Sequence, residues 1–151
     1  MTSPTELPFV EKVNTRYLET LVGYNARRAA LAVISQFLEE MAVYDLRPVD
    51  FSALSLITHN PGITSRQLCN TLGIQAPNIV AMVNGFEKRG LIARHAHPRD
   101  GRAFGLMLTA EGEALMAKAE KTASSLESSV SERLTLEERK TMIKLLKKIY
   151  K

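Results

Sequence analysis

The side chains of this chain that could do chemistry are cationic and amide groups gathered between Thr64 and Phe104. In that segment six lysines and arginines face two acidic residues, an excess of four that equals the formal net charge of the whole chain. The remaining segments therefore cancel to neutral, and positive charge is concentrated where anions such as phosphates can bind. The cationic residues are Arg66, Lys88, Arg89, Arg94, Arg99 and Arg102.

A mostly uncharged helix face accompanies this charge. Apolar residues recur at three- and four-residue steps after Gln75 and predict a helix with one buried stripe, formed by Ile79, Met82, Val83 and Phe86. The opposite face carries Gln75, Ala76, Pro77, Asn78, Val80, Ala81 and Asn84. Gln and Asn can pair bidentately with an adenine edge, and small apolar groups can touch thymine methyls. The alternative is an ordinary solvated helix face.

Two helices joined by a glycine turn are predicted to position this face. Thr64 and Gln67 have the spacing of a capping box, which satisfies free backbone donors at a helix start. Gly73 can adopt the left-handed conformation that ends a helix. Pro77 suits the first turn of the next helix, because its missing N–H would be unpaired there anyway. The segment is therefore predicted to be a helix-turn-helix.

A hairpin is predicted directly behind the second helix. Residues 91–97 alternate like a strand, residues 98–102 form a turn with basic side chains, and residues 104–108 form the returning strand. A hairpin in this position is a wing. The predicted fold class is mainly α with a small β-hairpin wing, a winged helix-turn-helix flanked by long dimerisation helices.

The flanking segments predict further helices. Apolar periodicity predicts one helix over residues 9–44, bent near Gly23, and a shorter one over residues 49–59 after the break at Pro48. Thr109 and Thr135 each begin another helix with acidic residues in its first turn. Residues 1–8 are polar, contain two prolines and predict a loose arm.

The apolar stripes of these flanks need partners. A small winged unit cannot cover them, and a soluble protein avoids contiguous exposed apolar area. We therefore expect a two-fold dimer in which the terminal helices of two chains interleave. The alternative is that the flanks fold on themselves as a monomeric bundle. The predicted organisation is a single domain over residues 1–151, with dimerisation helices at 8–46 and 110–151 and the winged helix-turn-helix at 47–109.

Catalysis and metal binding have little support in the sequence. We find no HExxH, paired CxxC, phosphate-binding glycine loop or Gly-x-Ser-x-Gly motif. His95 and His97 share a face of the predicted strand, but no carboxylate or cysteine ligand is obviously near them, so contact with phosphate or solvent is favoured over a metal site. Cys69 lies between Leu68 and Leu72 and is interpreted as a packing residue. We expect no enzyme, metal or cofactor.

Composition sets the remaining bounds. The single cysteine excludes an internal disulfide framework. No apolar run approaches the length of a membrane-spanning helix, and no signal-peptide pattern is present. We therefore expect a soluble cytoplasmic protein without a membrane partner.

The order of these motifs resembles the multiple-antibiotic-resistance regulator (MarR) family over nearly the whole chain. After the helix-turn-helix, the resemblance is carried by Glu87-Lys88-Arg89-Gly90-Leu91-Ile92, Asp100-Gly101-Arg102 and Leu108-Thr109-Ala110-Glu111-Gly112. It implies a homodimeric, sequence-specific double-stranded DNA-binding transcription regulator. It further implies a repressor that binds a palindromic operator and is released by a small aromatic or phenolic effector.

The resemblance also implies roles for single residues. Asp100 would orient the wing, and Arg102 would reach into the minor groove. Reading helices of the family often carry a charged or hydroxyl residue where this chain has Val80 and Ala81, so we expect sparse direct base readout. The predicted DNA-binding residues are Thr64, Ser65, Arg66, Gln75, Ala76, Pro77, Asn78, Ala81, Lys88, Arg94, His97, Arg99, Asp100 and Arg102.

An effector region is implied between the dimerisation helices and the winged unit. Its candidate lining residues are Tyr24, Arg28, Phe51 and His59, which would join aromatic surface to a cation or donor suited to an aromatic carboxylate. As alternatives, Tyr24 and Phe51 are core residues and Arg28 is a surface or dimer contact. The alternative function for the whole chain is a protein-interaction module that uses the winged scaffold without binding DNA.

Overall fold

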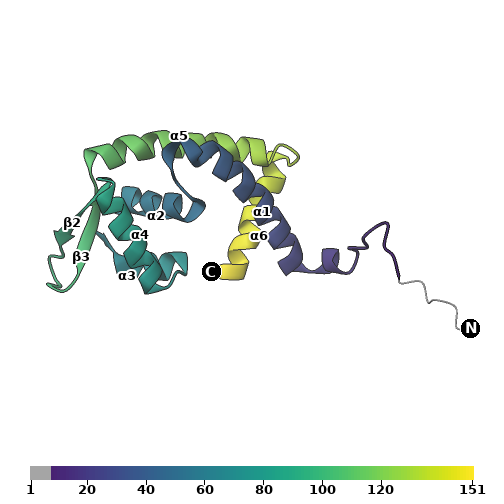
Figure 1. Cartoon of the computed structure of the whole chain (residues 1–151), viewed down its shortest axis with the longest axis horizontal. Helices are drawn as coiled ribbons and strands as arrows, with labels where there is room; N and C mark the ends of the chain where they lie inside the picture. The colour runs from purple at the N-terminus through teal and green to yellow at the C-terminus, as the bar shows by residue number, and fades with distance from the viewer. Residues whose placement is uncertain (1–7) are drawn as a thin grey trace, which may run out of the picture.

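The computed structural model describes residues 8–151, which form six α-helices and a three-stranded sheet. The winged unit lies at one end, α5 runs along one side of the molecule, and α1 and α6 lie at the other end (Figure 1). The elements are η1 (Leu18–Thr20), α1 (Val22–Met41), η2 (Ala42–Tyr44), α2 (Pro48–His59), β1 (Ile63–Thr64), α3 (Ser65–Leu72), α4 (Ala76–Lys88), β2 (Ile92–Ala96), β3 (Phe104–Leu108), α5 (Ala110–Val130) and α6 (Leu136–Tyr150).

This architecture confirms the predicted fold class of a mainly α protein with a winged helix-turn-helix. The loose arm predicted for residues 1–8 lies, apart from Pro8, outside the described residues. No helix within residues 8–151 is long and apolar enough to cross a membrane.

The wing is a three-stranded antiparallel sheet, where the sequence predicted only a hairpin. β3 lies in the middle, pairing with β2 over its whole length and with β1 through Ile63–Leu106 and Thr64–Gly105. Gly105 permits the approach of β1, because a Cβ atom there would lie 3.0 Å from the carbonyl oxygen of Gly62. The Gly62 N–H then donates to the Leu106 carbonyl at 2.9 Å. Because β1 has two residues, it has no alternation from which a strand could be predicted.

The boundaries of α3 and α4 follow the predicted local signals. The Thr64 hydroxyl accepts from the Gln67 N–H at 3.2 Å, and the Gln67 side chain accepts from the Thr64 N–H at 3.0 Å. Gly73 ends α3 in the left-handed region at φ 65°, and Pro77 lies in the first turn of α4. The capping box and the glycine stop are therefore confirmed.

The predicted apolar stripe of α4 packs into the core of the winged unit. Ile79, Val83 and Phe86 are buried, and Met82 is half-buried. They belong to one cluster with residues of the neighbouring elements, namely Leu54, Ile57, Leu68, Leu106, Met116 and Ala119. Each large apolar side chain that is fully buried contributes about 1.5–3 kcal/mol relative to its exposed state. This cluster fixes which face of α4 remains outside.

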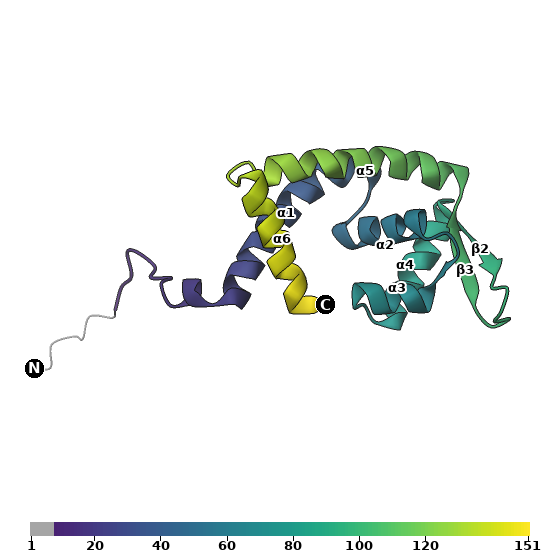
Figure 2. The same cartoon turned by 180° about the vertical axis from the view of Figure 1, so that it is seen from behind.

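The first predicted helix begins later than the periodicity indicates. The sequence predicts helix from residue 9, but residues 8–17 form no helix and α1 begins at Val22. Leu21 is extended, and the Asn25 side-chain amide donates to the carbonyls of Glu19 and Leu21 at 2.8 Å each. This side chain thereby satisfies the Glu19 carbonyl, which a continuing helix would pair with a backbone N–H group. The segment before α1 extends away from the rest of the protomer (Figure 2).

Apolar side chains of α1 and α6 remain uncovered within one protomer. α6 contains no buried residue, although its sequence presents an apolar stripe. Its exposed large apolar residues are Leu136, Met142, Ile143, Leu145, Leu146, Ile149 and Tyr150. On α1 and just before it, Leu18, Leu21, Val22, Leu31, Val33, Ile34 and Leu38 are exposed. Such contiguous apolar surface marks an interaction site.

α5 begins in close contact with the end of the helix-turn-helix. The Thr109 N–H donates to the Leu91 carbonyl at 3.0 Å, and the Thr109 hydroxyl donates to the Gly90 carbonyl at 2.6 Å. That hydroxyl also accepts from the Gly112 N–H at 3.1 Å, which confirms the predicted cap. A Cβ atom on Gly112 would lie 2.1 Å from the Leu91 carbonyl oxygen. We call these contacts among residues 90, 91, 109 and 112 the α5 junction.

Gly112→Ala is expected to destabilise the protein by about 1–3 kcal/mol, the range for overpacking at a tight site, because backbone atoms must separate. Urea unfolding followed by circular dichroism measures the change. Gly85→Ala is the matched control: Gly85 lies inside α4, and nothing lies within 4 Å of an added Cβ. The control is expected to retain or gain stability, since Ala favours helix interiors. Equal stability of Gly112→Ala and wild type would contradict the steric role.

Candidate nucleic-acid interface

α4 presents the predicted polar face to the outside. Gln75, Ala76, Pro77, Asn78, Val80, Ala81 and Asn84 are all exposed. Gln75 occupies the N-cap position without a side-chain cap hydrogen bond. Val80 is 51% exposed although it is apolar. The outer surface of α4 is therefore slim and uncharged in its first two turns, which suits entry into a major groove.

The wing turn is ordered by two of its own side chains. The His97 Nδ1 atom accepts from the N–H groups of Arg99 at 3.2 Å and Asp100 at 3.1 Å. The Asp100 carboxylate accepts from the Arg102 N–H at 3.0 Å. Asp100 thus bonds to the backbone of the wing turn, and its part in orienting the wing stays a prediction. His97 has a structural part in the turn that the sequence did not indicate, and its contact with DNA stays a prediction.

A groove separates the wing from the start of α3. It has a volume of about 480 Å³ and is lined by Thr64, Ser65, Arg66, Gln67, Arg94, His97, Asp100, Arg102, Ala103, Phe104 and Leu106. Arg66, Arg99 and Arg102 are exposed and form no ion pair with another residue in the described range 8–151. The structure therefore brings predicted contact residues of α3 and the wing to one groove. Arg66 lies on its α3 side and Arg102 on its wing side.

Arg94 lies differently from the other predicted contacts. Its guanidinium donates to the Glu87 carboxylate at 2.8 Å and to the Asn84 side-chain oxygen at 2.5 Å. These bonds attach β2 to the outer side of α4. Arg94 thus has a structural role that sequence reasoning missed, and its role as a DNA contact stays a prediction.

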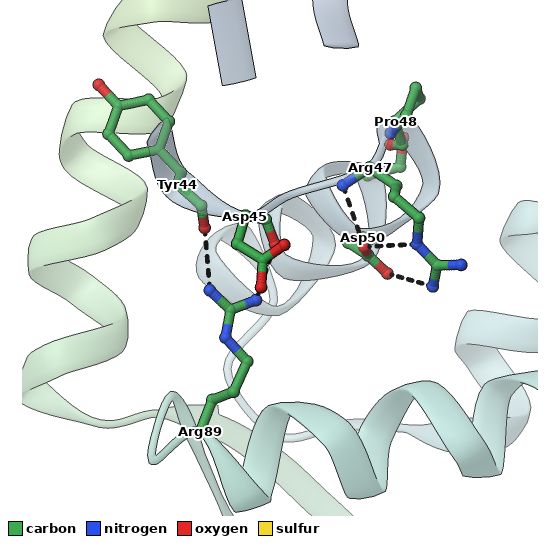
Figure 3. Close-up of polar contacts among 7 residues, drawn as sticks. Tyr44, Asp45, Arg47, Pro48, Asp50 and Arg89 are labelled. Carbon is green, nitrogen blue, oxygen red and sulfur yellow. Dashed lines mark hydrogen bonds and ion pairs between the residues drawn. The ribbon is translucent and has the colours of Figure 1, made fainter. Parts of the chain in front are cut away.

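Arg89 is also engaged inside the protein. Its guanidinium donates to the backbone carbonyls of Tyr44 and Asp45, at 2.9 Å each (Figure 3). Two of the six cations counted in the sequence therefore have internal partners. Lys88, in the last turn of α4, is exposed, like Arg66, Arg99 and Arg102.

The four predicted effector residues are not gathered into one pocket of the protomer. His59 Nε2 lies 2.8 Å from the Glu120 carboxylate, and Phe51 packs edge-on against Phe37 with ring centroids 5.4 Å apart. Tyr24 is half-buried and Arg28 exposed, both near the start of α1. That end of α1 lies far from α2 in both views (Figures 1 and 2). Their shared role in effector binding stays a prediction.

Sequence reasoning also missed a polar arrangement at the start of α2. Asp50 is buried, accepts from the Arg47 N–H at 3.0 Å and forms an ion pair with the Arg47 guanidinium at 3.0 Å. The hydrogen bonds from the Arg47 guanidinium to the Asp50 carboxylate, together with the negative charge of Asp50, raise the pKa of Arg47 above its ordinary value. The available signal was Arg47-Pro48 followed by Asp50, which marks a helix start with proline in its first turn.

The comparisons with known proteins agree with this geometry. The model of the MarR family matches residues 44–103. A Thauera aromatica protein whose name assigns it to regulation of the hcr operon is 31% identical over 131 residues, covering 86% of this chain and 79% of that protein. The chain belongs to the MarR family. MarR-family proteins are transcriptional regulators that bind DNA and catalyse no reaction.

Solved structures of another MarR-family protein are similar over nearly the whole chain. The transcriptional repressor CouR, bound to a 23-mer DNA duplex, superposes with a TM-score of 0.88 at 37% identity, covering 93% of this chain and all of that one. CouR bound to p-coumaroyl-CoA superposes with a TM-score of 0.81 at the same identity, covering 91% and 97% of the two chains.

Asp100→Ala is expected to loosen the wing turn of this MarR-family chain. The variant removes the acceptor of the Arg102 N–H, and one such hydrogen bond contributes about 0.5–1.5 kcal/mol. Amide hydrogen exchange at residues 99–103 should therefore quicken by roughly 2- to 10-fold, with unchanged exchange in α2. Arg99→Ala is the control, because it leaves both side-chain acceptors, His97 Nδ1 and the Asp100 carboxylate, in place. Unchanged exchange in Asp100→Ala would show that the turn is held by other contacts.

Proposed function

We propose that this chain is a homodimeric repressor of transcription that binds a palindromic double-stranded operator and is released by a small ligand. The observation that carries the proposal is the exposed, uncharged face of α4 beside a groove with free arginines on both sides. The DNA-bound CouR structure, with its TM-score of 0.88, supports the same use of the fold. As a regulator of transcription, it would act in the cytoplasm.

In this proposal α4 enters the major groove and the wing contacts the adjacent backbone and minor groove. Gln75 and Asn78 supply the bidentate amide groups, and Val80 and Ala81 contact thymine methyl groups. Because few side chains of α4 carry hydrogen-bonding groups, part of the specificity comes from the shape of the duplex. Arg66, Lys88, Arg99 and Arg102 neutralise phosphates or line the minor groove, and the Ser65 hydroxyl donates to a phosphate oxygen.

A second copy of the chain would cover the apolar surfaces of α1 and α6. Between Val22 and α6 lies a groove of about 590 Å³, lined on α6 by Met142, Leu145, Leu146 and Ile149 and also by Glu137, Glu138 and Thr141. Pairing these surfaces across a two-fold axis buries them in a self-complementary interface. The two α4 helices then bind half-sites whose centres lie about one turn of DNA, or 10–10.5 base pairs, apart.

The proposed effector is an aromatic acid or its coenzyme A thioester. The CouR structure with p-coumaroyl-CoA supports this class, because that protein shares 37% of its sequence and the fold with this chain. Tyr24 and Arg28 of one protomer can meet an effector held by the winged unit only if the site is completed by the second copy. Release requires that the ligand bind the DNA-incompetent arrangement more tightly than the competent one.

Arg102→Ala is expected to weaken binding to every duplex and to reduce the salt slope by about one, because one phosphate or minor-groove contact is lost. Fluorescence anisotropy at several salt concentrations, with an inverted repeat selected from a random pool, measures both quantities. Lys118→Ala, an exposed cation on α5, is the control and should retain the wild-type slope. Wild-type protein that shows no salt-sensitive binding to any duplex would contradict DNA binding and favour a protein-interaction module.

Addition of p-coumaroyl-CoA is expected to release the protein from that selected duplex at a concentration that leaves p-coumarate inactive, if the thioester is recognised. Release by both compounds would place recognition on the aromatic acid alone. Coenzyme A without an acyl group is the control, and the same anisotropy assay measures the three additions. Release by none of them, up to millimolar concentration, would contradict this effector class.

A further inference from the structure

The C-terminal end of α4 is attached to the connection between α1 and α2 by one side chain. Arg89 is the C-cap residue of α4. Its Nη1 donates to the Asp45 carbonyl and its Nη2 to the Tyr44 carbonyl, both at 2.9 Å (Figure 3). The two bonds form a fork onto consecutive carbonyls, which the planar guanidinium can make and a lysine ammonium cannot.

The backbone that receives these bonds is itself shaped to present its carbonyls. Tyr44 ends η2, the turn that follows α1 directly, and Asp45 caps it in the left-handed region at φ 51°. Asp45 is the only non-glycine residue with positive φ among residues 8–151. Such a residue costs about 1–2 kcal/mol and persists where its surroundings hold it. The two bonds from Arg89 are part of what holds it.

The same connection is attached to α5. The Tyr44 hydroxyl lies 2.9 Å from the Thr122 hydroxyl, within hydrogen-bond distance. Tyr44 therefore binds α4 through its backbone and α5 through its side chain. One continuous set of contacts runs from the end of α4 through Arg89 and Tyr44 to both long helices. We call it the Arg89–Tyr44 link.

Residues 45–50 and α4 are not closely packed against each other beside this link. A cavity of about 610 Å³ lies between the 45–50 segment and α4, lined among others by Asp45, Arg47, Met82 and Arg89. Arg47 is bound to Asp50 at 3.0 Å, so it takes no part in the link. The Arg89 hydrogen bonds cross this side to residues 44 and 45, whereas the buried stripe of α4 packs in the core cluster and its backbone lies nearest to α3 and β2.

We propose that Arg89 is a positioning residue that sets the angle of α4 relative to α1 and α5, and thereby the half-site spacing that the dimer selects. The inference rests on the proposed function, because spacing has meaning only for a dimer with two reading helices. Arg89 itself does not touch DNA in this proposal. Its effect passes through the Arg89–Tyr44 link.

The test compares wild type and Arg89→Gln on inverted repeats that differ only in the number of central base pairs. Wild type is expected to prefer one spacing. In Arg89→Gln the affinity ratio of the best to the next spacing should fall by about 2- to 30-fold, the range for residues that modulate coupling without contacting a ligand. Affinity for a single half-site and the salt slope should stay as in wild type.

Control variants keep the test decisive. Lys118→Gln removes an exposed charge of α5 without touching the link and should keep the wild-type spacing profile. Tyr44→Phe removes the bond to Thr122 but keeps the carbonyl, so the profile should broaden by a smaller factor than in Arg89→Gln. It also carries the test if Arg89→Gln does not fold.

Three results would overturn the inference. One is an unchanged spacing profile in both link variants. Another is equal loss of affinity for half-site and repeat, which would mean a purely structural role. A third is a salt slope lower by about one in Arg89→Gln, which would mean direct phosphate contact. Wild type that selects no inverted repeat would refute the proposed function, and this inference with it.

Discussion

The close approach of α5 to the Leu91 carbonyl is the constraint on which the rest of the structure depends. Gly112 permits this approach, since an added Cβ would lie 2.1 Å from that oxygen. Thr109 stabilises it by donating hydrogen bonds to the carbonyls of Gly90 and Leu91. The end of the helix-turn-helix, the beginning of the wing and the start of α5 therefore meet at one junction. From there the 21-residue α5 extends to the far end of the protomer.

Structural features that depend only on a few neighbouring residues, such as helix caps, could be predicted from the sequence. The capping boxes of Thr64 and Thr135 and the left-handed Gly73 are local, because the partners lie within five residues. β1 could not be predicted, since its two residues become a strand only by pairing with β3, about forty positions later. The start of α1 was also missed, because apolar periodicity says nothing about the Asn25 side chain binding two backbone carbonyls.

In the candidate nucleic-acid interface too, local features could be predicted from the sequence and long-range contacts could not. Exposure of the Asn78 face follows from helical periodicity once the opposite stripe is buried, so it was predicted correctly. The partners of cationic side chains do not follow from any period. Arg89 binds carbonyls 44 and 45 positions earlier in the chain, and Arg94 binds residues on another element. By sequence all six cations counted equally, and only the fold separates structural arginines from free ones such as Arg102.

The hydrogen bonds that join α4 to distant parts of the chain lie in its C-terminal half, whereas the candidate reading residues lie at its N-terminal end. The α5 junction and the Arg89–Tyr44 link both lie at its C-terminal end, whereas Gln75 and Asn78 lie at its N-terminal end. A helix of this length spans about 20 Å, so a rotation of about 5° at the C-terminal end moves the other end by about 1.7 Å. Hydrogen bonds to base edges tolerate only a few tenths of an ångström. In the proposed function, a ligand that rotated the C-terminal end of α4 by a few degrees would therefore abolish readout without unfolding or translating the winged unit.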